Sequence, residues 1–170
     1  LPMKDGAATD VTRVEAAKPT ILELTEKGAK VLLLAHFGRP KGQRNSTMTT
    51  SFVQGDVDAV LGKEIMFIPE VMGPVVEQSI GILRAGDIGL LENVRFWPGE
   101  ESNDTDFAKG IAAHGDFYVN DAFSAAHRAH ASTEGLARLL PAYAGRAMEE
   151  ELKALDAALG APEQPVAAVV

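Results

Sequence analysis

The chain has 170 residues, of which 46% are hydrophobic and 24% are charged, and its formal net charge is −8. This balance is typical of one globular domain; it excludes a collagen, a coiled-coil rod and a disordered tail, and it disfavours nucleic acid as a partner. Cysteine is absent, no export leader is visible, and the aliphatic run at residues 31–35 is too short to cross a bilayer. We therefore expect a cytoplasmic protein with no membrane contact.

The first elements along the chain are predicted to be a helix, a strand and a loop. Apolar residues at helical spacing follow Asp10, a good N-cap, as far as Gly28, but Pro19 interrupts them, so we expect a kink or two abutting helical pieces. Residues 30–35 form a continuous apolar run, which is typical of a buried strand. The Gly- and Pro-rich stretch at 36–42 predicts an irregular loop.

The remaining segments continue the alternation of helices and strands. Apolar spacing and start signals predict further helices over residues 50–61, 74–83, 104–113 and 148–160. Short apolar runs predict strands over residues 64–68, 88–91 and 116–119, the last as a third central strand. This order indicates an α/β domain with a mainly parallel sheet.

Both ends of the chain are typical of a piece of a longer protein. It begins with Leu1 rather than an initiator methionine, and it stops in a strand-like run at residues 166–170 with no turn or cap after it. We therefore expect a chain that is truncated at both ends.

Arginine follows each of three predicted strands. Arg39, with His36 before it, comes after the strand at 30–35, and Arg95 and Arg128 come after two later strands. In open parallel sheets, ligands bind beyond the carboxyl ends of the strands. Cations gathered there repel each other unless an anion holds them, and guanidinium groups match the oxygens of phosphate and carboxylate. The sequence therefore predicts a site for a small anion, although any single arginine could also be a solvated surface charge.

Arg13 adds a fourth candidate. It lies in the first turn of the first predicted helix, where the helix dipole disfavours a cation. An anion bound at that helix end would explain its presence.

Other polar residues are weaker candidates. His127 and His130 lack carboxylates at metal-binding spacing, so we interpret them as loop hydrogen-bonding groups or anion contacts. Glu100, Glu101 and Asp104 are interpreted as a solvated turn and a helix start. No glycine-rich nucleotide loop and no nucleophilic serine motif occur in the sequence.

Several segments together resemble a known family. They are residues 9–13 (TDVTR), 35–42 (AHFGRPKG), 91–96 (LENVRF), 100–104 (EESND) and 119–132 (VNDAFSAAHRAHAS). In this order they resemble the amino-terminal half of the phosphoglycerate kinases, over nearly the whole chain. The resemblance implies one three-layer, Rossmann-like α/β domain over residues 1–170, with a mainly parallel sheet whose first strand is missing. It also implies that the family's Asp-x-Asn-Val-Pro substrate motif is represented only by Leu1 and Pro2.

The resemblance further implies roles for individual residues. Arg39, Arg95 and Arg128 would hold the 3-phosphate of 3-phosphoglycerate, and Arg13 would face the phosphoryl group being transferred. The implied substrate-binding residues are Arg13, His36, Phe37, Gly38, Arg39, Arg95 and Arg128, and Arg13 is the implied catalytic residue. MgATP or MgADP would bind in a carboxy-terminal domain outside this chain, and no metal site is expected within it.

Two functions remain open. The first is the substrate half of a glycolytic and gluconeogenic phosphoglycerate kinase, which interconverts 1,3-bisphosphoglycerate plus ADP and 3-phosphoglycerate plus ATP; this half would be inactive alone, and the complete enzyme would be a monomer. The second is a non-catalytic module that binds a small phosphorylated acid.

Overall fold

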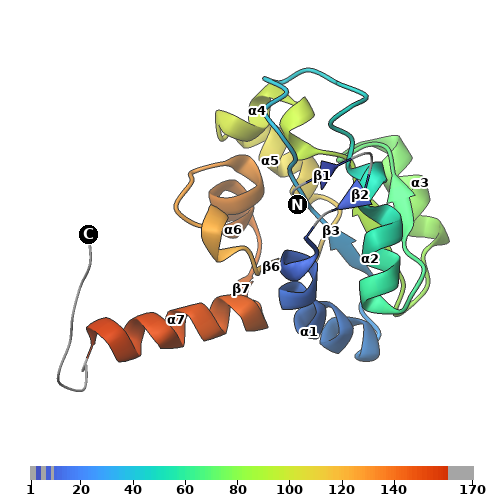
Figure 1. Cartoon of the computed structure of the whole chain (residues 1–170). Helices are drawn as coiled ribbons and strands as arrows, with labels where there is room; N and C mark the ends of the chain where they lie inside the picture. Colours follow the sequence, from blue (N-terminus) through green and yellow to red (C-terminus); the bar gives the residue numbers. More distant parts are fainter. Residues whose placement is uncertain (1–2, 5–6, 9, 161–170) are drawn as a thin grey trace.

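The structure is a computed structural model that describes residues 3–4, 7–8 and 10–160 (Figure 1). Leu1, Pro2 and the run predicted at 166–170 lie outside these residues. No helix within the described ranges is both long enough and apolar enough to cross a membrane.

The central element is a parallel sheet in the strand order β3-β5-β4. Strand β5 (Ile88–Leu91) lies in the middle and is buried throughout, between β3 (Val31–Leu33) and β4 (Met66–Ile68). The parallel arrangement predicted from the sequence is thus confirmed. Strand β3 is shorter than its apolar run because the carbonyl of Ala35 leaves the ladder and accepts a hydrogen bond from the Val94 amide at 3.2 Å.

Helices cover both faces of this sheet. The helices are α1 (Thr12–Glu26), α2 (Gln54–Leu61), α3 (Pro74–Ile82), α4 (Pro98–Glu101), α5 (Thr105–Ala112), α6 (Leu136–Leu139) and α7 (Arg146–Leu159). Ile88 and Leu90 of β5 pack in one buried cluster with residues of α1 and α2, whereas Leu91 packs in a second cluster with residues of α3, α5 and α6. Successive strand residues point to opposite faces, so the domain has three layers.

Helix α1 differs from the expected pair of helical pieces. It is one helix of 15 residues that contains Pro19. Because Pro19 is exposed, water can satisfy the carbonyl that loses its intrahelical partner. The N-cap position is Val11, without a side-chain bond, but the Asp10 carboxylate still accepts a hydrogen bond from the Thr12 amide at 2.9 Å.

The strand predicted at 116–119 is not a member of the central sheet within the described residues. Strand β6 (Tyr118–Asn120) instead pairs in parallel with β7 (Ala142–Ala144). The residues of β7 are all exposed, so no apolar pattern predicted this strand. A second small pair, β1 (Met3–Lys4) with β2 (Ala7–Ala8), is antiparallel and was also not predicted.

Helix α7 is fixed mainly at its first turn and extends away from the rest of the domain (Figure 1). The Arg146 amide donates to Thr20 Oγ1 of α1 at 2.7 Å, and the Met148 amide donates to Asp121 Oδ1 at 3.0 Å. Of the apolar stripe predicted for this helix, Met148 is buried, while Leu152, Leu155 and Leu159 are exposed.

The core assignment can be tested with two isoleucines. Ile68 of β4 is fully buried and Ile82 of α3 is 69% exposed. We expect Ile68→Ala to lower the free energy of unfolding by about 3 kcal/mol, because it removes buried methyl groups and leaves a cavity. The matched Ile82→Ala should cost less than about 1 kcal/mol. Urea unfolding measures both, and equal losses would contradict the assigned core.

Candidate functional site: a cationic cluster at the strand ends

A buried amide fixes the loop that follows β3. The side chain of Asn93, just after β5, is fully buried. Its Nδ2 donates to the carbonyls of Phe37 at 2.7 Å and Met48 at 2.8 Å, and its Oδ1 accepts from the Phe37 amide at 3.2 Å. One side chain therefore holds both ends of the loop 37–48 against the carboxyl end of β5.

Two glycines let this loop lie close to its neighbours. Gly38 has φ +63°, and a Cβ there would lie 2.8 Å from the sulfur of Met48. Gly42 has φ +73°, and a Cβ there would lie 2.9 Å from the ring of Pro98. The left-handed backbone favours glycine at both positions, and at Gly42 the rigid ring and backbone of Pro98 leave no room for a Cβ.

Arg95 lies beneath the same loop. It belongs to the 3-10 turn η2 (Val94–Phe96) and is only 9% exposed. Its Nη1 donates to the Gly38 carbonyl at 2.8 Å, and its Nε is 3.5 Å from Glu101 Oε1 without a hydrogen-bond partner in the described part of the chain. The guanidinium is therefore held in place by one hydrogen bond and one ion pair.

The His36 ring is influenced by the charge of Arg95 and by charges in the segment after β6. The pKa of His36 is lowered to about 4, mainly by partial loss of water around the ring and then by the positive charges of Arg95, Arg128 and His130. The residue as a whole is exposed, so the neighbouring charges are the more informative of these causes. We name His36, Arg95, Arg128 and His130 the cationic cluster, since the charges of the other three act on the His36 ring.

Arg128 and His130 are positioned by short-range contacts. Arg128 Nε lies 3.4 Å from Nε2 of the adjacent His127, and the Arg128 carbonyl accepts from Thr133 Oγ1 at 2.8 Å. Thr133 belongs to the π-helical turn η4 (Ala131–Gly135), which directly follows His130. Such turns are frequent at functional sites.

Two buried carboxylates support these loops, and the sequence did not indicate either. Glu92, 5% exposed, accepts from the Thr50 amide at 2.9 Å and from Thr49 Oγ1 at 2.7 Å. Glu100 is 1% exposed, so its interpretation as part of a solvated turn was wrong. Its bonding partner Ser132 is 32 residues away, and local sequence pattern does not reveal such a pair. Asp104 does begin a helix, because its carboxylate caps α5 by accepting from the Phe107 amide.

Arg13 and Arg39 are not joined to the cluster by a hydrogen bond or an ion pair within the described residues. Arg13, in the first turn of α1, and Arg39, in the loop after β3, are both exposed. Neither guanidinium makes a hydrogen bond or an ion pair with any residue that the structure describes, although the charge of Arg13 helps to lower the pKa of Asp10. Phe37 contributes its backbone to the Asn93 contacts.

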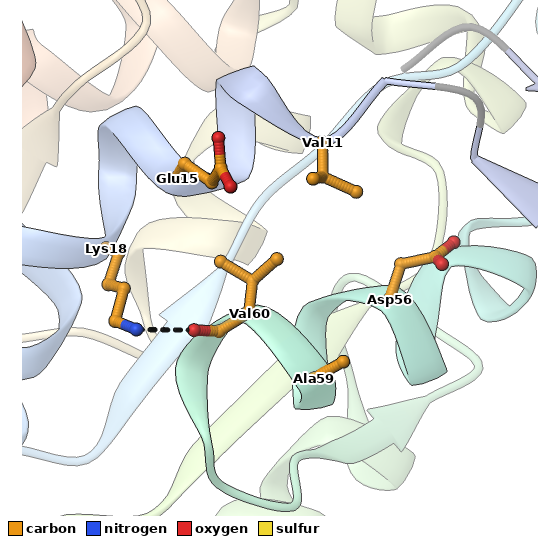
Figure 2. A pocket seen from close by; sticks show the side chains of 6 residues that line it. All are labelled: Val11, Glu15, Lys18, Asp56, Ala59 and Val60. Atoms are coloured by element: carbon orange, nitrogen blue, oxygen red, sulfur yellow. Dashed lines mark hydrogen bonds between the residues drawn. The ribbon is translucent and has the colours of Figure 1, made fainter.

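A shallow groove between α1 and α2 is a separate feature (Figure 2). It is lined by Val11, Glu15, Lys18, Asp56, Ala59 and Val60. Lys18 Nζ donates to the Val60 carbonyl at 2.7 Å, so its charge is already bound at the end of α2. None of the predicted site residues lines this groove. Among the described residues there is also no group of three or more histidine and carboxylate side chains that could hold a metal ion.

The charge environment of His36 yields a pH prediction. Its pKa of about 4 lies below the ordinary value of 6.5, so between these values the unfolded chain binds more protons than the folded one. The free energy of unfolding should therefore fall as the pH drops through this window, and His36→Gln should reduce the fall. Urea unfolding at pH 7 and pH 5 measures this.

The same ring also reports on anion binding. Inorganic phosphate should raise the pKa of His36, because an anion offsets the neighbouring positive charges. NMR titration of the ring follows this change. A ring that titrates at its ordinary value, or that ignores phosphate, would contradict the assembled cluster.

Comparisons with known proteins agree on one family. The family model described as phosphoglycerate kinase matches residues 1–170. The phosphoglycerate kinase of Sphingopyxis alaskensis is 65% identical over 170 residues, which are 100% of this chain and 43% of that relative. That of Rhizorhabdus wittichii is 59% identical, with the same coverage of 100% and 43%.

Solved structures agree with the sequence relatives. Phosphoglycerate kinase from Coxiella burnetii has a TM-score of 0.85 and 36% identity, covering 97% of this chain and 41% of that one. The enzyme from Pyrococcus horikoshii has a TM-score of 0.86 and 33% identity, covering 96% of this chain and 42% of that one. The chain thus spans less than half the length of these relatives.

Proposed function

The chain belongs to the phosphoglycerate kinase family, and we propose that residues 1–170 form the amino-terminal, 3-phosphoglycerate-binding domain of a two-domain kinase. The observation that carries this proposal is the cationic cluster. On a chain of net charge −8, the charges of Arg95 and Arg128, which follow different strands, both act on the ring of His36. Their mutual repulsion is best offset by an anion with several oxygens, such as a phosphate ester.

The complete protein would transfer a phosphoryl group between ATP and the C1 carboxylate of 3-phosphoglycerate. In the forward glycolytic direction, 1,3-bisphosphoglycerate and ADP give 3-phosphoglycerate and ATP, so one P–O bond breaks as another forms. The nucleotide, as MgATP or MgADP, would bind outside residues 1–170 and supply or accept the phosphoryl group. Catalysis of this kind depends on alignment and on neutralisation of charge, with little covalent participation by the protein.

Within this chain, some residues would bind the 3-phosphate and another would act on the transferred phosphoryl group. Arg95 and Arg128, with His36 and the exposed Arg39, would hold the 3-phosphate, while the peptide groups of Phe37 and Gly38 shape the loop around it. Arg13 would neutralise charge on the transferred group, because arginine supplies a permanent positive charge without a proton transfer. No observation favours the alternative of a non-catalytic binding module.

Further properties of the complete protein are part of the same proposal. Its partners would be 3-phosphoglycerate, 1,3-bisphosphoglycerate and its own carboxy-terminal domain, and it would act as a monomer in the cytoplasm. The isolated residues 1–170 would not turn over substrate.

Removal of the cluster arginines tests the binding site. In the full-length protein, Arg95→Ala and Arg128→Ala should each weaken 3-phosphoglycerate binding by about 1.5–3 kcal/mol, since each removes charged hydrogen bonds. Calorimetry measures the affinity, and thermal unfolding checks the buried Arg95 variant. The control is Arg84→Ala, an exposed arginine after α3, which should leave the affinity unchanged. Similar losses in all three variants would contradict the assigned site.

The role of Arg13 is tested by the turnover rate rather than by the affinity for 3-phosphoglycerate. Because it would act on the group in transfer rather than on the 3-phosphate, Arg13→Ala should lower kcat by more than about tenfold and change 3-phosphoglycerate affinity by less than about twofold. Steady-state kinetics with a separate binding measurement distinguishes the two effects, with Arg84→Ala again as control. An unchanged kcat would remove Arg13 from the reaction.

A further inference from the structure

Glu100 is a buried acid beside His130 of the cationic cluster, and no role proposed above uses it. It is the next-to-last residue of α4, five residues after Arg95 in the chain, and is 1% exposed. A buried carboxylate is costly unless its oxygens are bonded and its charge is balanced. Its contacts show how both conditions are met.

Both carboxylate oxygens are bonded by one residue of the turn that follows His130. Oε2 accepts from the Ser132 amide at 2.9 Å, and Oε1 accepts from Ser132 Oγ at 2.6 Å. Ser132 is the second residue of η4. The carboxylate therefore ties α4 directly to the segment that carries Arg128 and His130.

The charge of the same carboxylate faces the cluster. Oε1 is 3.6 Å from Nδ1 of His130, whose ring is largely shielded from water. The charge of His130 also acts on His36. The acid beside Nδ1 limits the positions that the His130 ring can take. The negative charge of Glu100 also helps to raise the pKa of Tyr118 to about 12, after loss of water.

We propose that Glu100 is a positioning residue: its buried carboxylate holds the turn after Arg128 and orients the His130 imidazole within the cationic cluster. It touches no substrate and acts through these two groups. This inference rests on the proposed phosphate site, because a positioning role has meaning only where an anion binds.

A double-mutant cycle in the full-length protein tests the proposal. Glu100→Gln removes the charge but keeps the size of the side chain, and it should raise the Kd for 3-phosphoglycerate about tenfold with little change in kcat. His130→Gln should raise the Kd to a similar extent. Because Glu100 acts in part through His130, the rise in Kd of the double variant should be smaller than the product of the two single rises. Glu64→Gln, at an exposed position before β4, is the matched control and should leave the Kd unchanged.

The outcomes separate this proposal from the proposed function. Independent effects that multiply in the double variant, or an unchanged Kd in folded Glu100→Gln, would overturn the positioning role alone. If the unsubstituted protein does not bind 3-phosphoglycerate, the phosphate site itself is wrong and the inference fails with it. If Glu100→Gln does not fold, Ser132→Ala tests the positioning role instead, because it removes one hydrogen bond to the carboxylate. A Kd raised about threefold supports the proposal, and an unchanged Kd overturns it.

Discussion

The buried side chains of Asn93 and Glu100 hold the loops that carry the cationic cluster, and the proposed site depends on these attachments. Cations brought together on one edge of a domain repel each other, so the loops that carry them need attachments that do not depend on the ligand. Asn93 bonds the backbone at both ends of the loop after β3, and Glu100 bonds the turn after His130. Because these groups are buried, their hydrogen bonds are specific and costly to lose.

The parallel sheet explains why these attachments can reach their targets. Strand β5 lies between β3 and β4, so the residues that follow it are near the loops of its neighbours. Asn93 and Arg95 come just after β5, and both bond the loop after β3. A turn later, Glu100 reaches the segment that follows β6. The chain from 93 to 100 therefore joins the loops that carry the cluster.

Sequence alone predicted much of the framework and part of the site. The alternation of elements, the parallel sheet and the positions of Arg95 and Arg128 after strands follow from apolar runs and from the geometry of parallel sheets. The burial of Glu92 and Glu100 could not be predicted, because their partners Thr50 and Ser132 are 42 and 32 residues away. Strand β7 was missed because its exposed residues carry no apolar pattern. Helix α1 was expected to be interrupted, since sequence does not show that Pro19 faces solvent.

Under the proposed function, the cationic cluster recognises the phosphate group of 3-phosphoglycerate. The most direct test of this recognition is a calorimetric titration of the full-length protein with 3-phosphoglycerate and, separately, with glycerate, which lacks the phosphate. We expect 3-phosphoglycerate to bind at least about a hundredfold more tightly, because several charged hydrogen bonds to phosphate are lost with glycerate. Equal affinity for the two acids would contradict this recognition.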